Sequence, residues 1–163
     1  MDGQEKPERT DCLIDIALDE TSIRRTNHNI EHEREVAIYD LLDANSFALS
    51  GGPAGPYKLR LALIEDRLVF QVMDAAGQDL MAHMLALSPF RRIIRDYFTV
   101  CDSYYQAIKT APASRIQAID MGRRGLHDEG SRILVERLNG KIDVDHDTAR
   151  RLFTLICALR WKG

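Results

Sequence analysis

The densest group of residues capable of chemistry lies at Ile119–Gly130, where the sequence reads IDMGRRGLHDEG. Guanidinium groups bind anions, and a histidine beside carboxylates can take up and release a proton. Glycine permits turns and a close approach of the backbone to a ligand. The pattern predicts a glycine elbow that presents arginines to an anion, but it also fits a plain break between two helices. The candidate residues are Arg123, Arg124, His127, Gly122 and Gly125.

A second group of cations lies near the start of a predicted helix. Ser88 and Pro89 form a typical helix start, an N-cap followed by a first-turn proline. Arg91 and Arg92 follow, where each positive charge opposes the helix dipole by roughly 0.3–1 kcal/mol. We therefore expect the two arginine pairs to converge on one pocket for a phosphate or carboxylate, with His127 at its edge. Ion pairs with acidic residues of the N-terminal half are the alternative.

A glycine-rich stretch, SGGPAGPY at 50–57, is similar to a phosphate loop only superficially. A Walker loop requires Gly-Lys-Ser/Thr leading into a helix, whereas this stretch leads into a predicted strand. The prolines favour a rigid turn, with a cis bond at Pro53 or Pro56. Gly51 and Gly52 are included as candidate backbone contacts of the site.

No recognised cofactor or metal motif accompanies these residues. His28 to His32 reads HNIEH, which matches the inverted zinc-protease motif, but zinc binding would require a third ligand. The three cysteines are far apart and form no CxxC pair. We therefore predict neither a cofactor nor a metal site.

Charge is divided unevenly along the 163 residues. Residues 1–56 carry 5 Lys+Arg against 12 Asp+Glu, and residues 57–163 carry 17 against 13, which together give the net charge of -3. The basic part predicts an anion-facing surface, whose partner would be a phosphate-bearing ligand, a nucleic acid or an acidic protein. Packing of the two parts against each other, with mutual neutralisation, is the alternative.

The composition, with 45% hydrophobic and 29% charged residues, is that of an ordinary globular protein. The apolar run LFTLICAL is far shorter than the roughly 20 residues that span a bilayer. Widely spaced cysteines fit a reducing compartment. We expect a cytoplasmic protein without membrane association, folded as a single domain over residues 1–163 with a flexible tail at 1–10.

The elements that must position the site are strands first and helices afterwards. Runs that alternate or are rich in apolar residues are CLIDIAL at 12–18, KLRLALIE at 58–65, RLVFQVMD at 67–74 and DLMAHMLAL at 79–87. The last three are joined by short turns and predict an antiparallel meander.

Apolar residues at helical spacing predict helices over about 28–43, 88–109, 114–121 and 129–139, then an extended KIDVD link and a final helix capped by Asp145 or Asp147. In the first of these, Arg34 is assigned to the polar face. The helix at 88–109 should lie across the sheet with Phe98 and Tyr105 buried. The fold class is α+β: an antiparallel sheet of about four strands packed by helices, with a helical C-terminal half.

Six segments of the sequence carry a resemblance to a known family. They are EHEREVAIYDLL (31–42), GGPAGPYKLRL (51–61), SPFRRIIRDYF (88–98), CDSYYQAI (101–108), AIDMGRRGLHDEG (118–130) and DTARRLFTLIC (147–157). In these blocks the chain resembles a small bacterial family known only as an uncharacterised protein family, number 0262 of that set. The resemblance implies a small cytosolic bacterial protein, and it brings no assigned activity, cofactor or catalytic residue.

Three functions follow as hypotheses. The first is a non-enzymatic binding or regulatory module for an anionic partner. The second is a hydrolase or phosphoryl-transfer enzyme that uses Arg123, Arg124 and His127. The third is a protein-interaction subunit without a small-molecule site. The sequence leaves the identity of the partner, the presence of catalysis and the oligomeric state open.

Overall fold

A computed structural model describes residues 9–160. Its elements, in chain order, are β1 (Leu13–Leu18), α1 (His28–Asp43), β2 (Phe47–Leu49), β3 (Tyr57–Ile64), β4 (Arg67–Asp74), β5 (Asp79–Ala86), η1 (Ser88–Phe90, a 3-10 turn), α2 (Arg91–Thr110), α3 (Ala113–Leu138), β6 (Ile142–Val144) and α4 (His146–Arg160). The predicted tail at residues 1–10 lies outside the described residues except for its last two. The predicted α+β class and helical C-terminal half are confirmed.

The sheet has the strand order β1-β3-β4-β5. The predicted meander is confirmed, since β3, β4 and β5 pair antiparallel in sequence. The sheet as a whole is mixed, because β1 pairs parallel with β3. A parallel pair needs a long crossover connection, and here the connection contains α1 and β2. A small second sheet joins β2 to β6, so that the predicted extended link at 141–145 becomes a strand.

The alternation of apolar and polar residues along each strand decides which face of the sheet is buried. Leu59 and Leu61 of β3 stand beside Val72 and Phe70 of β4, and all four are almost fully buried. Their neighbours in the sequence point to the opposite face and are more exposed, as Arg60 is. One face of the sheet therefore belongs to the core, as a half-buried antiparallel sheet requires.

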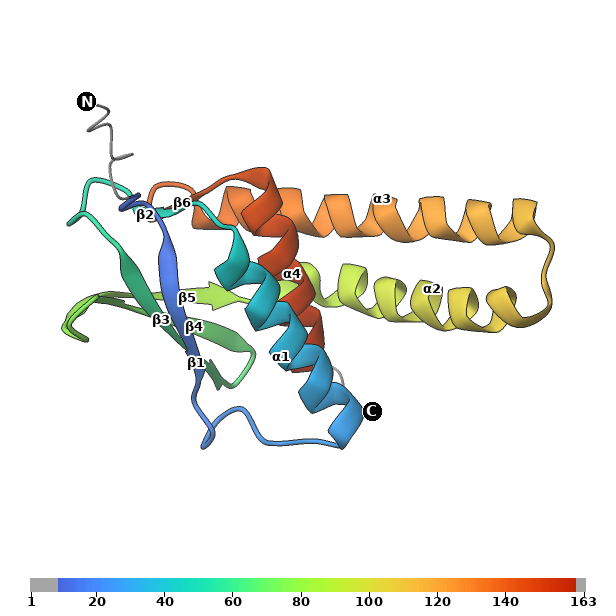
Figure 1. The fold of residues 1–163 in the computed structure, drawn as a ribbon, viewed down its shortest axis with the longest axis horizontal. Coiled ribbons are helices and arrows are strands. Elements are labelled where there is room, and N and C mark those ends of the chain that lie inside the picture. The colour runs from blue at the N-terminus through green and yellow to red at the C-terminus, as the bar shows by residue number, and fades with distance from the viewer. Residues whose placement is uncertain (1–8, 161–163) are drawn as a thin grey trace, which may run out of the picture.

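The helices fall into two groups (Figure 1). α1 lies beside β1 and packs on α4, and α4 packs in turn on α3. α2 and α3 form a helical hairpin that extends away from the sheet (Figure 1). Among the described residues, none of the helices combines the length and apolar composition needed to cross a membrane.

The expectation that α2 lies across the sheet with Tyr105 buried is wrong. Only the base of α2 enters the core, through Ile93 and Ile94, and Tyr105 is 57% exposed on the extended part. Phe98 is partly buried and packs against the core. α2 packs against α3 instead, in the helical hairpin. The predicted Ser88 cap is also wrong, because Ser88 begins the turn η1 and its side chain caps neither element.

The predicted glycine elbow is wrong as well, because α3 runs unbroken through Gly122 and Gly125. Neither glycine has a positive φ, and a Cβ at either position would meet no atom within 4 Å among the described residues. A glycine inside a helix costs about 1 kcal/mol relative to alanine. Packing of the long helix against α2 and α4 outweighs that cost. The predicted stop at residues 139–140 is confirmed, with Gly140 at φ +86°.

Two further local predictions are confirmed. The SGGPAGPY stretch forms a turn with a cis Gly55–Pro56 bond, and Gly51 adopts φ +67° within it. Asp145 caps α4, since its carboxylate accepts a hydrogen bond from the Thr148 amide at 2.8 Å.

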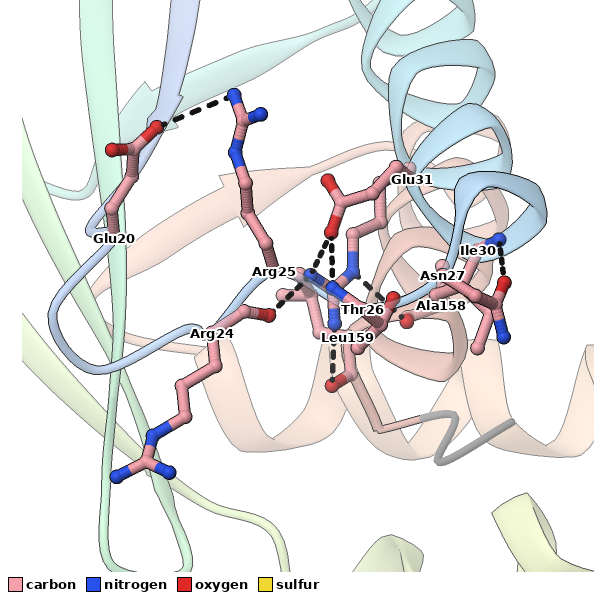
Figure 2. Close-up of polar contacts among 10 residues, drawn as sticks. Glu20, Arg24, Arg25, Thr26, Asn27, Ile30, Glu31, Ala158 and Leu159 are labelled. Carbon is pink, nitrogen blue, oxygen red and sulfur yellow. Dashed lines mark hydrogen bonds and ion pairs between the residues drawn. The ribbon is translucent and has the colours of Figure 1, made fainter.

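The position of α4 is fixed by Arg34, which the sequence pattern wrongly assigns to solvent. Arg34 is 4% exposed and reaches the last turn of α4, where its Nε donates to the carbonyl of Ala158 at 3.2 Å. It also donates to the carbonyls of Leu159 and Arg24 and pairs with Glu31 (Figure 2). The last carbonyls of a helix have no partner within the helix, so a buried cation there satisfies them.

Candidate anion-binding site

Side chains from α2, α3 and α4 surround a cavity of about 270 Å³ on the hairpin side of the molecule. The lining residues are Tyr97, Arg123, Arg124, His127, Arg150 and Thr154. Three are arginines and none is acidic. Five of the lining residues belong to α3 and α4, which pack on each other.

Arg123 and Arg124 share one carboxylate from the preceding turn of α3. Arg123 Nε donates to Asp120 at 3.1 Å, and Arg124 lies 3.0 Å from the same carboxylate. The hydrogen bond from Arg123 lowers the pKa of Asp120 below its usual value. Arg123 also lies over the ring of Tyr104, with 5.1 Å from its guanidinium carbon to the ring centroid. One negative charge thus holds two guanidinium groups, which leaves an excess of positive charge.

Arg150 reaches the cavity from α4. It forms an ion pair with Asp128 of α3, and His146 lies 3.9 Å from that same carboxylate. Because Asp128 does not line the cavity, Arg150 is oriented by a carboxylate while it faces the other arginines. Ion pairs between neighbouring helices of this kind preorganise a guanidinium fork for an anion.

The His127 ring is held in one orientation. Its Nε2 lies 2.8 Å from Thr154 Oγ1, whose hydroxyl donates to the carbonyl of Arg150 at 3.1 Å. Because the Thr154 hydroxyl proton is donated to that carbonyl, the Thr154 oxygen must accept the hydrogen bond from His127. The proton of the neutral histidine is therefore on Nε2. Nδ1 is buried and has no hydrogen-bond partner within residues 9–160. Burial, followed by the nearby Arg150 charge, lowers the His127 pKa to about 4, so the ring is neutral at pH 7.

Aromatic packing supports this arrangement. The ring of His127 lies 5.3 Å from that of Phe153 and 5.8 Å from that of Tyr97, measured between centroids. Phe153 can approach α3 because residue 130 is glycine: a Cβ there would overlap the phenyl ring. Gly130 therefore sets the distance between α3 and α4, and with it the distance between the arginines of the two helices.

The structure brings together only part of the predicted site. Arg123, Arg124 and His127 line one cavity, whereas Arg91 lines a different one with Arg95. Arg91 pairs with Asp66 and Arg92 with Asp96. These partners lie outside the acidic segment 1–56 that was considered as their counter-charge.

The predicted glycines lie apart from the cavity. Gly51 and Gly52 follow β2, and Gly122 and Gly125 are exposed on α3. None of the four lines the cavity.

The pocket predicted from the sequence did not include Arg150, Thr154 or Tyr97, although Arg150 belongs to the arginine groups from which an anion site was expected. Arg150 and Thr154 stand one turn apart on α4, and that spacing alone places them on one face. Their association with α3 depends on how α4 packs, which no local pattern states. Tyr97 is one of the apolar residues whose spacing predicts the helix at 88–109, and that spacing alone gives it no role in a site.

The HNIEH segment gives no metal centre. His28 and His32 are exposed in the first turns of α1. Within residues 9–160, no three His, Cys, Asp or Glu side chains are grouped so that they could hold a metal ion.

Comparison with known proteins places the chain among its relatives. The model of the Uncharacterised protein family (UPF0262) matches residues 10–162. The chain belongs to this family. A UPF0262 protein of Rhodopseudomonas palustris strain BisB18 is 55% identical over all of both chains. Another, from Brucella anthropi, is 57% identical over 93% of this chain and 94% of its own.

A third UPF0262 protein, from Nitrobacter winogradskyi, is 55% identical over 99% of this chain and 98% of its own. The likeness therefore extends through every element of the fold. No solved structure matches the chain.

Proposed function

We propose that the protein is a binding module for a small phosphate-bearing ligand, held in the cavity lined by Arg123, Arg124 and Arg150. One observation carries this proposal: three guanidinium groups from two helices line a cavity that has no acidic side chain in its wall. Guanidinium forks match the geometry of phosphate oxygens.

The shape of the cavity favours a small ligand over the other anionic partners considered. Its volume of about 270 Å³ is close to the lower end of the range usual for small-molecule sites. A nucleic acid or an acidic protein would call for an extended basic surface. The net charge of -3 gives no support for such a surface.

The state of His127 supports binding rather than catalysis. A general base needs a nitrogen that can reach the proton of a substrate. In His127, Nε2 is bonded to Thr154 and Nδ1 is buried, so the ring presents no available nitrogen to the cavity. The phosphoryl-transfer hypothesis therefore lacks its proposed acid or base. We also propose a cytoplasmic location, which suits the free thiols of Cys12, Cys101 and Cys157.

Isothermal titration with inorganic phosphate tests the proposal, using Arg124→Ala as the altered protein. Arg124 has a 69% exposed side chain, and Asp120 keeps Arg123 as a partner after the change. Binding should weaken by about tenfold, which corresponds to one charge-assisted hydrogen bond. The melting temperature should stay the same. Added salt should weaken wild-type binding, since screening shortens the reach of charge to about 8 Å at physiological ionic strength.

Arg132→Ala is the matched control, because Arg132 is an exposed arginine of α3 two turns further on and does not line the cavity. It should bind phosphate like the wild type. Equal weakening in both variants would reduce the effect to net charge and refute the site. So would the absence of any binding to the wild-type protein at low salt.

A further inference from the structure

A second cavity adjoins the arginine cavity and is of a different chemical kind. It has a volume of about 170 Å³ and lies between α1, α2 and α4. Phe98, Cys101 and Cys157 supply aromatic and sulfur surface. An apolar cavity of roughly 150 Å³ is large enough to hold a benzene ring. This space would therefore accept one ring or a short alkyl group.

The two cavities share part of their walls. Tyr97, Arg123 and Thr154 line both. Because three side chains from three different helices are common to the two spaces, they meet at these residues. A ligand with its head at the arginines would reach the second cavity past these three side chains.

Two thiols and one hydroxyl in the wall of the second cavity are uncharged at neutral pH. Burial raises the pKa of the Cys101 thiol, and it also raises the pKa of the Cys157 thiol and of the Tyr97 hydroxyl. All three groups therefore keep their protons at pH 7. Neutral thiols and aromatic rings favour an apolar group as their neighbour.

Charge also fixes the orientation that a bound ligand would adopt. Glu33 of α1 lines the second cavity, and Arg124 and Arg150 line only the first. An anionic head is thus attracted at one end and repelled at the other. A ligand with acidic groups at both ends would be disfavoured.

We propose that the two cavities form one site for a phosphate monoester that bears a compact apolar substituent, with the phosphate at Arg123, Arg124 and Arg150 and the substituent between Phe98, Cys101 and Cys157. This inference rests on the proposed phosphate-binding function and adds the chemical class of the ligand.

Paired titrations with inorganic phosphate and phenyl phosphate test it. The two probes share the anionic head, and only phenyl phosphate has a ring to bury. Phenyl phosphate should bind the wild-type protein about tenfold or more tightly than phosphate, as burial of a ring of this size predicts. Cys101→Leu fills the second cavity and should bring the ratio of the two affinities close to one. Ser103→Leu, on an exposed part of α2, should keep the wild-type ratio.

Thiol protection gives a second measurement that needs no variant. Cys101 is partly buried, and Cys12, which directly precedes β1 and lines neither cavity, serves as internal reference. Phenyl phosphate should slow alkylation of Cys101 relative to Cys12, as read by peptide mass spectrometry. Inorganic phosphate should leave the ratio of the two rates unchanged.

The results separate the two proposals. If both probes bind equally, depend on Arg124 and leave Cys101 unprotected, the ligand class is refuted and the phosphate-binding function stands. If neither probe binds, or if binding ignores Arg124→Ala, both proposals fail. A tighter phenyl phosphate complex that survives Cys101→Leu and does not protect Cys101 would also refute the ligand class, because the ring would then lie elsewhere.

Discussion

Replacing Arg34 by alanine should destabilise the fold more than any change on the surface. The guanidinium group of Arg34 is buried and contacts the carbonyls of Ala158 and Arg24 at 3.2 and 2.9 Å, with Leu159 and Glu31 as further partners. A hydrogen bond to a charged group contributes about 1.5–3 kcal/mol. Arg34→Ala removes the two well-formed contacts and leaves carbonyl acceptors at the end of α4 without a donor. We therefore expect the free energy of unfolding to fall by about 3–5 kcal/mol, the range usual for a broken buried ion pair.

Urea denaturation followed by far-UV circular dichroism measures this loss as a lower midpoint. The slope of the free energy with urea should be unchanged, because the same surface is exposed on unfolding. Arg34→Lys should recover only part of the stability, since one ammonium cannot reach carbonyls in two segments at once.

Arg25→Ala is the control, next in the sequence to Arg24, whose carbonyl Arg34 contacts. Arg25 is 80% exposed and lies 3.7 Å from Glu20, so its removal should change the free energy of unfolding by no more than about 0.5 kcal/mol. A loss below about 1 kcal/mol for Arg34→Ala would show that the end of α4 does not depend on this clamp, and the reasoning would fail.

Two further predictions concern α3 and His127. Gly122→Ala should stabilise the protein by roughly 0.5–1 kcal/mol, since a Cβ there meets open space. Gly130→Ala should destabilise it by roughly 1–3 kcal/mol, because its Cβ overlaps Phe153. If urea titrations showed that both variants change the free energy of unfolding in the same direction, the packing of α3 would be contradicted. His127 has a pKa of about 4 in the folded state against 6.5 in the unfolded state, so stability should fall as pH falls from 6.5 to 4. His127→Gln should flatten that part of a melting-temperature profile, and an unchanged profile would speak against a buried neutral ring.

Local pattern was sufficient for much of the fold. Helix α1 begins and ends where apolar spacing predicted, at His28 and Asp43. The β3–β4–β5 meander follows from alternation between short turns. Both are elements whose partners are near in the sequence, so the signal that predicts them is local as well.

Long-range packing accounts for what the sequence did not predict. Parallel pairing of β1 with β3 depends on the crossover through α1. The burial of Arg34 depends on carbonyls more than 120 residues away. At Gly122, a local cost of about 1 kcal/mol suggested a break, but tertiary packing decided otherwise.

Only part of the candidate site could be predicted from the sequence, for the same reason. Arg123, Arg124 and His127 lie within two turns of one helix, so their proximity can be read from spacing. Arg150 joins them only because Gly130 lets Phe153 bring α4 close to α3. Arg91 and Arg92 suggested convergence through their unfavourable place in the helix dipole, and nearby aspartates offset that charge instead.

The place of α4 in the chain has a consequence for biosynthesis. Four apolar side chains of this helix are almost fully buried, and the helix packs against α1 and α3, which are made before it: Leu152, Phe153, Leu155 and Ile156. A nascent chain that has reached only β6 exposes the apolar surfaces of α1 and α3 that α4 will cover. The fold can therefore close only after residues near 160 have left the ribosome. Until then the exposed apolar surface makes the nascent chain prone to aggregation.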